Sequence, residues 1–457
     1  MPLIIPSNSI SAGGYVVDNS LRFNDGSSDN LTKTSSTGSN TTSTFSGWIK
    51  RANLGAEMKI LNFTGGGNNL NIEFKSDDQF SANAYDGSSQ FSLKTNRKFR
   101  DPSAWYHIVV AIDSTQSTSS NRIKIYVNGV QETSFTTSNY PTQNDTLVMN
   151  NHLSSNPFIG QNGSSNHFFD GYMAEICWID GQQLDPTSFG EFDEDTGIWK
   201  PIDVSGLTFG TNGFYLDFEN SGSLGADVSG NGNNFTVNNL TSDDQVIDTP
   251  TNNFATLNPL DNYWSNGTLS NGNLTFLSDT SNVTYIPSTI GVNSGKWYWE
   301  VEFDAKSGGS DSPVIGITST QPTAGNQQLG YFPNDWGYSG YSPSFYINNN
   351  TETSYGSSYT TNDIIGVALD LDNNKLYFSK NGTWQNSGDP TSGATGTGAL
   401  SITDPSSTPL GFYFPAICYY NVSNTGTFNA NFGSSAFSYT VPSGYYALNT
   451  KNLAEYG

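Results

Sequence analysis

The clearest pattern of hydrophobic and polar positions lies between residues 363 and 384. The apolar run 364–371 is nearly unbroken, which predicts a strand buried on both faces. Residues 372–374 are Asp-Asn-Asn and predict a turn, because short Asx side chains bond to their own backbone and tolerate left-handed angles. Residues 375–380 alternate again, and Asn381-Gly382 predicts a second tight turn. The segment therefore predicts two antiparallel strands.

Similar patterns recur along the N-terminal half of the chain. Residues 45–49, 70–74 and 122–130 alternate between apolar and polar side chains, and 105–112 is a longer apolar run. Aromatic residues make up 13% of the chain and glycine occurs 47 times, a composition that suits strands joined by many turns. We therefore expect an all-β chain built of two antiparallel β-sandwiches in tandem, with almost no helix.

The composition divides the chain into four parts. Residues 1–14 contain two prolines and end on a Gly-Gly pair, which predicts a short N-terminal docking arm. Residues 15–201 and 262–457 each hold a full set of alternating strands, so each is expected to fold as its own sandwich. Residues 202–261 hold short apolar stretches among Asn, Gly and Pro, and are expected to form a connector with short strands.

The C-terminal sandwich resembles a known family. Four segments match it in the expected order around the hairpin described above: 295–301, 314–317, 412–417 and 428–433. Together they resemble the SPRY (B30.2-like) domain over residues 262–449. This resemblance implies a bent β-sandwich that binds partners through its loops and performs no chemistry.

The N-terminal sandwich resembles a second family. Its matching segments are a Gly-Trp strand at 45–49, a Trp-Tyr-His strand at 105–112, a Tyr-Val-Asn-Gly hairpin at 122–130 and a late strand at 169–176. They are similar to the concanavalin A-like jelly roll, in its laminin-G and pentraxin branch, over residues 15–200. The resemblance implies a two-sheet sandwich of a kind that often binds carbohydrate.

The net charge limits the kinds of partner expected, and the cysteine content bears on disulfide formation. The net charge is −23, from 41 acidic and 18 basic residues, so nucleic acid is repelled and is not an expected partner. No apolar run is long enough to span a membrane, and residues 1–6 show no secretory signal, so neither membrane insertion nor secretion is expected. The two cysteines, Cys177 and Cys418, fall in different sandwiches and are expected to be free, buried thiols.

Alternating acidic residues raise the question of catalysis. The two sets are Glu300, Glu302 and Asp304, and Glu191, Asp193 and Asp195. Glycosidases of the concanavalin A-like fold use alternating acids on a strand as acid and nucleophile. The first set falls in the other sandwich, however, and Gly and Pro closely follow the second. A solvated outer strand face is the favoured interpretation, and we expect the chain not to be an enzyme.

One loop has the spacing of a calcium site. Asp227, Ser229 and Asn231 match the first half of an oxygen-ligand loop, but Asn238 stands where an acidic residue would close it. A turn whose side chains satisfy its own backbone is favoured, and calcium remains the alternative.

Other candidate metal ligands are less specific. Asp170, beside Asn166, would be a ligand if the N-terminal sandwich keeps a laminin-G-like calcium site. The three histidines, His107, His152 and His167, share no metal-ligand spacing, and His107 is interpreted as a core residue. No cofactor is expected.

Aromatic residues supply the candidate ligand-binding site. They crowd residues 331–346 without strand alternation and recur after a predicted strand, and the candidates are Trp336, Tyr338, Tyr341, Tyr419 and Tyr420. Exposed aromatic rings can stack on sugars or cover peptides. The alternative, that they close the end of the sandwich as core, is equally supported for the first three.

The opening sequence suggests an origin. Residues 6–15, followed by Asn-Ser-Leu-Arg-Phe-Asn at 19–24, resemble the start of structural proteins from tailed phages of marine bacteria. This implies a virion component made in the host cytoplasm and displayed on the virion surface. Leu3, Ile4 and Ile5 are expected to bury against another subunit or virion protein, within a homo-oligomer.

These observations favour one function over two others. The main hypothesis is a non-enzymatic tail fibre or similar appendage that binds host cell-surface glycan. A capsid head fibre or decoration protein is the structural alternative. A glycan-cleaving hydrolase is the alternative from another class.

Overall fold

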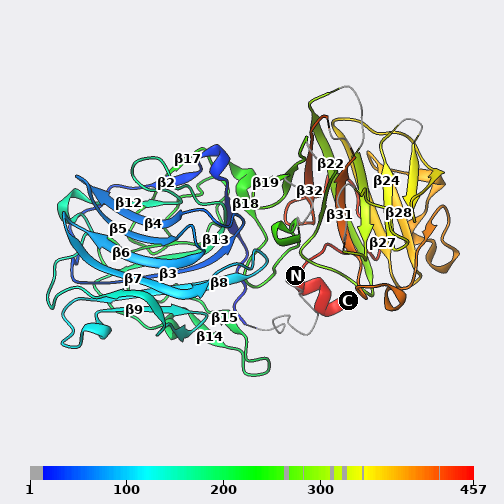
Figure 1. Ribbon diagram of the computed structural model, residues 1–457. Coiled ribbons are helices and arrows are strands. Elements are labelled where there is room, and N and C mark those ends of the chain that lie inside the picture. Colours follow the sequence, from blue (N-terminus) through cyan, green and yellow to red (C-terminus); the bar gives the residue numbers. More distant parts are fainter. Residues whose placement is uncertain are drawn as a thin grey trace. The chain divides into compact units, whose positions relative to one another are not determined.

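In a computed structural model of the chain, the described residues are 14–261, 267–280, 283–308, 313–321, 327–341, 344–420 and 423–457. They divide into two compact units, one within Ile10–Thr251 and one within Asn252–Gly457, here called the first and second units. Each unit is a sandwich of two antiparallel sheets (Figure 1). The expected all-β fold with two sandwiches in tandem is confirmed. The arm residues Leu3, Ile4 and Ile5 lie outside the described residues.

The first unit contains two large sheets. Sheet A has the strand order β10 (Val130–Gln131), β9 (Ile123–Val127), β8 (Trp105–Asp113), β3 (Thr42–Arg51), β13 (Gly171–Asp180), β1 (Ser20–Phe23) and β18 (Gln245–Val246), with β16 (Phe214–Leu216) also paired to β13. Sheet B has the order β11 (Phe135–Asn139), β7 (Ser89–Lys98), β6 (Gln79–Tyr85), β5 (Asn68–Phe74), β4 (Met58–Gly65), β12 (Asn156–Ile159), β2 (Asn30–Thr32) and β17 (Thr236–Asn238).

The core of the first unit lies between sheets A and B. Successive side chains of a strand point to opposite faces, so the alternating residues of β9 place Ile123, Ile125 and Val127 in the core. The outer face of sheet A is also covered by chain, where the hairpin of β14 (Gly190–Phe192) and β15 (Trp199–Pro201) packs apolar side chains against it. The outer face of sheet B instead carries polar side chains, and it holds the candidate site described below.

The connector expected at residues 202–261 is corrected by the structure. Its first fifty residues supply β16, β17 and β18 to both sheets of the first unit, and the division between the units falls between Thr251 and Asn252. These strands contain only two or three residues each, too few to show an alternating pattern.

The second unit is also built from two sheets. Sheet C has the order β19 (Thr268–Ser270), β20 (Thr275–Leu277), β32 (Gly426–Asn431), β22 (Lys296–Lys306), β27 (Asp363–Asp370), β28 (Lys375–Lys380) and β29 (Thr383–Trp384), with β30 (Leu400–Ser401) also paired to β28. Sheet D has the order β21 (Thr284–Pro287), β31 (Phe414–Tyr419), β23 (Pro313–Thr318), β24 (Asp335–Ser339), β25 (Phe345–Asn348) and β26 (Thr351–Ser354).

The hairpin predicted at 363–384 lies in sheet C. Strand β27 is buried along most of its length, and Asn381 and Gly382 adopt positive φ angles of 50° and 76° in the turn between β28 and β29. Both predicted turns are therefore confirmed.

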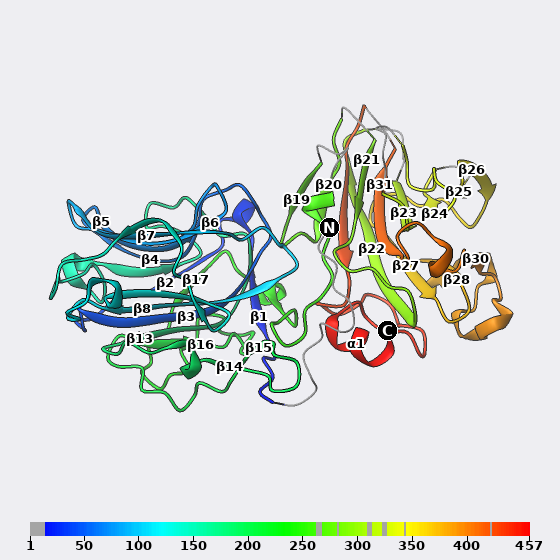
Figure 2. The ribbon, with the colours of Figure 1, turned by 60° about the horizontal axis from the view of Figure 1, so that its bottom comes forward.

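Short segments complete the second unit. The helix α1 (Thr450–Tyr456) follows the last strands (Figure 2). Before it, the segment 437–445 packs against the outer face of sheet C, where Tyr298 of β22 and Tyr377 of β28 meet Tyr445. Within the described ranges, no helix is long and apolar enough to cross a membrane. Cys177 and Cys418 are both free and buried, as expected.

Candidate functional site

A polar trough lies on the outer face of sheet B, over strands β4 to β7. Its volume is about 420 Å³. It is lined by Glu57, Lys59, Asn71, Glu73, Lys75, Ser81, Asn83, Ala84, Tyr85, Ser89, Phe91, Ser92 and Lys94. Most of the polar lining residues occupy every second position of their strands, while the residues between them fill the core.

A ladder of amide side chains crosses the trough floor. Asn62 faces Asn71 on the next strand, and Asn71 faces Asn83 on the strand after that. Asn62 Nδ2 donates to Asn71 Oδ1 at 2.8 Å, and Asn71 Nδ2 donates to Asn83 Oδ1 at 2.9 Å. Asn83 Nδ2 donates to Glu73 Oε1 at 2.7 Å. The ladder holds planar polar groups in fixed orientations.

An ion-pair network occupies the other half of the trough. Lys59 contacts Glu73, which is 1% exposed, and also lies 3.0 Å from Glu57. Lys75 lies 2.7 Å from Glu57 and 3.3 Å from Glu73. Burial alone would raise the pKa of Glu57, but the hydrogen bonds from Lys75 and Lys59 outweigh it and lower that pKa to about 2. Glu57 is therefore ionised throughout the physiological range.

The charges that line the trough are balanced once Asp77, which lies beside it, is included, although the chain is strongly acidic. Lys94 pairs with Asp77 at 2.5 Å beside the network. Three lysines (Lys59, Lys75 and Lys94) thus balance three carboxylates (Glu57, Glu73 and Asp77). At the rim, the ring of Tyr85 is 43% exposed. The arrangement offers fixed hydrogen-bonding groups beside one exposed aromatic ring.

Sequence reasoning did not find this trough. The alternation at 70–74 was recognised as a strand, but its outward residues Asn71 and Glu73 were not considered as a site. The available signal was the polar member of each alternating pair on four consecutive strands. It becomes a site only once the cross-strand register is known.

The five candidate aromatic residues do not form one exposed site, because some of them are buried and others are exposed. Trp336 and Tyr338 lie on strand β24, and Tyr338 is fully buried with its hydroxyl donating to the Ser357 carbonyl. Tyr419 is also buried, whereas Tyr341 and Tyr420 are 50% and 51% exposed.

The core alternative therefore holds for Trp336 and Tyr338, and the binding candidate Tyr419 is corrected to a core residue. Tyr338 and Tyr419 belong to the core between sheets C and D, and the half-buried Trp336 packs against that core and stacks on Tyr346. Only Tyr341 and Tyr420 keep rings available to a ligand.

The alternating carboxylates serve structural roles. Glu300 is buried and accepts hydrogen bonds from Tyr298 Oη at 2.8 Å, Ser438 N at 2.7 Å and Tyr439 N at 2.9 Å. The solvated outer face favoured from the sequence is thus corrected at Glu300, which anchors the segment 437–445. Glu302 accepts one hydrogen bond, from Asn429, and Asp304 is half-buried on the same strand.

The second acidic set lies in the β14–β15 hairpin. Asp193 accepts hydrogen bonds from Asp195 N and Thr196 N and pairs with Lys200 at 3.1 Å. Glu191 is exposed, 3.4 Å from Lys200. Asp193 therefore stabilises the turn of this hairpin.

The calcium candidates are occupied by protein groups. Asp227 accepts hydrogen bonds from the backbone N–H groups of Tyr215, Ser229 and Asn233, at 2.7 to 3.0 Å. Ser229 Oγ accepts from Asn231 N, and Asn231 Nδ2 donates to two backbone carbonyls. The geometry matches the favoured interpretation, a turn satisfied by its own side chains.

The remaining metal candidates do not converge. Asp170 is buried, while Asn166 is exposed. Among the described residues, no three His, Cys, Asp or Glu side chains come together as a metal site.

His107 is a core residue, as interpreted from the sequence. It is fully buried, stacked on Trp48 at 4.8 Å, and burial lowers its pKa to about 3. Trp199 Nε1 donates to its Nδ1 at 2.9 Å, so the proton of the neutral ring is on Nε2, which lies 2.8 Å from Ser46 Oγ. His107 thus links sheet A to the β14–β15 hairpin.

Comparisons with known proteins agree with both sandwiches. A family profile described as "Concanavalin A-like lectin/glucanases superfamily" matches residues 25–182, and the SPRY domain profile matches residues 296–430. Ran-binding protein 9 of Danio rerio is 34% identical over 98 residues, which are 21% of this chain and 15% of that protein. The human Ran-binding protein 9 is 33% identical over 98 residues, 21% of this chain and 12% of its own length.

Parts of the chain also match solved structures. The SPRY domain of human HERC1 is 17% identical, with a TM-score of 0.30, and the match covers 39% of this chain and 99% of that one. Stonustoxin is 24% identical, with a TM-score of 0.28, covering 39% of this chain and 27% of its own. The chain spans only 12–15% of the curated Ran-binding relatives above. The two profile matches show that this chain contains a concanavalin A-like domain in its first unit and a SPRY domain in its second.

Proposed function

We propose that this protein is a non-enzymatic surface component of a phage virion, a tail fibre or similar appendage, that binds host cell-surface glycan through the trough. The observation that carries the glycan part is the trough itself, a neutral, amide-lined hollow on a concanavalin A-like domain. The virion part is supported by the resemblance of residues 6–24 to the start of phage structural proteins.

The chemistry of the trough suits a sugar. Each sugar hydroxyl both donates and accepts. The amide N–H groups of Asn71 and Asn83 are bonded within the protein, so the second lone pair of each Oδ1 remains as a fixed acceptor. Each lysine that lines the trough has three N–H donors and pairs with at most two carboxylates, so it keeps a donor for a sugar hydroxyl. The exposed Tyr85 ring adds an apolar face on which a sugar ring can stack. Because the trough charges balance, a neutral glycan enters without the repulsion that an anion meets from the rest of a chain with net charge −23.

The same carboxylates disfavour the hydrolase alternative. Glycoside hydrolysis needs one carboxylic acid that holds a proton near neutral pH. Glu57, with a pKa of about 2, is ionised, and Glu73 is surrounded by two ammonium groups and an amide donor. Glu57 is therefore suited to accepting hydrogen bonds and not to protonating a leaving group.

Binding to purified host-surface polysaccharide tests the glycan proposal. The wild-type chain should bind and release no reducing ends, and Asn83→Ala should weaken binding about tenfold by removing one side of the ladder. Phe192→Ala is the control, since this ring is also exposed on the first unit but lies in the hairpin that packs on sheet A. Release of reducing sugar, or unaltered binding by Asn83→Ala, would contradict the proposal.

The placement on the virion needs a separate test. Gold-labelled antibody against this chain should decorate particles at the tail, whereas decoration of the capsid would support the head-fibre alternative. Deleting residues 1–12 should abolish incorporation into particles, because this arm is proposed to bind another subunit or virion protein. Normal incorporation of the truncated chain would show that the arm is not needed for binding to the virion.

A further inference from the structure

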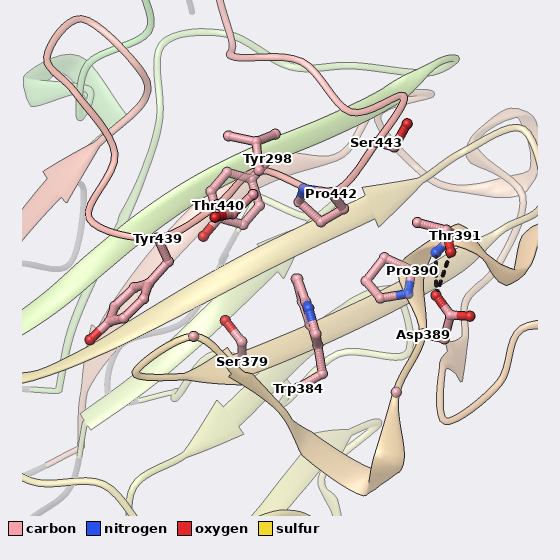
Figure 3. Close-up of a pocket in the computed structure, with 13 residues that line it drawn as sticks. Tyr298, Ser379, Trp384, Asp389, Pro390, Thr391, Tyr439, Thr440, Pro442 and Ser443 are labelled. Carbon is pink, nitrogen blue, oxygen red and sulfur yellow. Dashed lines mark hydrogen bonds between the residues drawn. The ribbon is translucent and has the colours of Figure 1, made fainter.

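A second hollow lies on the outer face of sheet C, in the SPRY domain (Figure 3). Its volume is about 490 Å³. The floor is formed by Tyr298 of β22 and Ser379 of β28, both nearly fully buried. Trp384 stands between Ser379 and the first residue of the 3-10 helix Pro390–Thr395, and residues 439–443 form the opposite wall. We call this hollow the aromatic cavity.

The walls of the aromatic cavity are fixed before any ligand arrives. Glu300 holds residues 438 and 439 by accepting both of their backbone N–H groups. Tyr445 Oη donates to the Pro390 carbonyl at 2.9 Å and so joins the two walls. Asp389 Oδ1 caps the 3-10 helix, accepting from Thr391 N at 2.9 Å. A preformed cavity spends little binding free energy on ordering its own walls.

Aromatic and proline rings are the largest group of side chains that line the cavity. Three aromatic side chains and two prolines face the hollow, and the other side chains are hydroxyls, one valine and one carboxylate, Asp389. Among the described residues that line the cavity, there is no amide and no basic side chain, in contrast to the trough. The indole N–H of Trp384 donates to no group within the described part of the chain, so it remains a donor for a ligand.

These groups match the chemistry of an extended, proline-containing peptide. A polyproline II segment keeps its backbone carbonyls unpaired and presents rigid apolar rings, and it is recognised by aromatic-lined grooves. Trp384 offers both a flat ring and an N–H donor for such a carbonyl. Asp389 and the net charge of −23 disfavour an acidic segment and favour one with basic residues.

We propose that the aromatic cavity binds a proline-containing segment of another protein, flanked by neutral or basic residues. This site is independent of glycan binding in the trough. It gives the chain a second binding activity, directed at protein and not at carbohydrate.

Titration of peptide probes into the full-length chain tests the proposal. The probes are decaproline, decaproline with two added arginines, and decaproline with two added glutamates. Isothermal titration calorimetry measures the affinity of the chain for each probe. The arginine form should bind most tightly and the glutamate form most weakly. Trp384→Ala should abolish binding, and Trp384→Phe, which keeps a ring but loses the N–H, should weaken it about fivefold.

Two further variants keep the test decisive. Ser443→Trp fills the exposed rim of the cavity without altering its packed floor, and it should block binding even if Trp384→Ala fails to fold. Tyr331→Ala, a partly exposed aromatic elsewhere in the second unit, should leave binding unchanged. The proposal is overturned if no probe binds, if Ser443→Trp binds normally, or if Trp384→Phe loses oligosaccharide binding instead.

Discussion

The trough and the aromatic cavity are hollows of similar size on the outer faces of two β-sheets, yet their chemistry is opposite. The trough, of about 420 Å³, is lined by amides and paired charges from four adjacent strands. The cavity, of about 490 Å³, is lined by aromatic and proline rings brought together from three distant parts of the chain. Volume alone thus says little about the ligand. What covers each sheet decides the chemistry that faces solvent.

The largest expected effect is on the pH dependence of stability, in which a buried acid outside the trough, Glu175, differs from the trough carboxylate Glu57. Glu175 lies in a bulge of β13, where it accepts hydrogen bonds from Tyr15 and Tyr215, and burial raises its pKa to about 7. The folded unit therefore binds this proton more tightly than the unfolded chain. The stability this provides is fully present below pH 4.5 and is lost as pH rises through about 7.

Glu175→Gln should remove this pH-dependent loss of stability. For a pKa shift of this size, the loss in the free energy of unfolding is about 3 kcal/mol. Thermal melts of the wild type and the variant between pH 4.5 and 8 measure it. Glu57 has the opposite sign, since its contribution is present above pH 4.5 and lost only as pH falls toward 2. Trough affinity for glycan should thus stay constant from pH 5 to 8. If the melting temperatures of the wild type and Glu175→Gln change with pH in the same way, Glu175 does not have this role.

The next effect tests whether the cavity wall depends on Glu300. Glu300→Ala removes the acceptor for two backbone N–H groups and for the Tyr298 hydroxyl, so the free energy of unfolding should fall by about 2 kcal/mol. Hydrogen exchange at Ser438 and Tyr439 should accelerate, and peptide binding should be lost while glycan binding persists. Glu302→Ala, which loses one hydrogen bond on the same strand, is the matched control. Slow exchange retained in Glu300→Ala would contradict this anchoring role.

A smaller effect is expected at the trough rim. Tyr85→Ala removes a ring that is 43% exposed, so the melting temperature should hardly change. Glycan affinity should fall about tenfold, the equivalent of roughly 1.4 kcal/mol for a lost stacking contact. Titration calorimetry with the same polysaccharide measures this change. A variant that melts much earlier would show instead that Tyr85 supports the fold.

The smallest effect is expected for the outermost ion pair. Lys94→Ala breaks the contact with Asp77, whose side chain is 44% exposed, and such exposed pairs contribute about 0 to 1 kcal/mol. Affinity for a neutral glycan should change less than threefold, because the ladder is untouched. Denaturant unfolding and titration at two salt concentrations measure both quantities. A large loss of stability would mean that this pair belongs to the buried network around Glu73.

Much of the fold follows from the sequence because strand alternation and Asx-Gly turns are local signals. The hairpin at 363–384 and the core strands of both sandwiches were predicted from such patterns. Short strands were expected in residues 202–261, but their membership in the sheets of the first unit was not, because two or three residues carry no period. The alternative left open at Tyr338 has a similar cause, since only strand pairing shows that the Trp-Gly-Tyr run of β24 faces the core on one side.

The candidate site was less predictable because it depends on register. Asn62, Asn71 and Asn83 lie on three consecutive strands, and only the register of β4, β5 and β6 brings them into one row. A bulge after Lys59 shifts that register by one position. Without the bulge, Asn62 would point into the core. No local pattern announces such a shift.

A single titration with matched variants tests whether the trough is the glycan-binding site. The double variant Asn83→Ala/Tyr85→Ala removes a ladder amide and the rim ring, and the variant Trp384→Ala alters only the aromatic cavity. With one purified host oligosaccharide, we expect affinity at least tenfold weaker for the double variant and unchanged for Trp384→Ala. Wild-type affinity in the double variant, with binding lost in Trp384→Ala, would contradict the account.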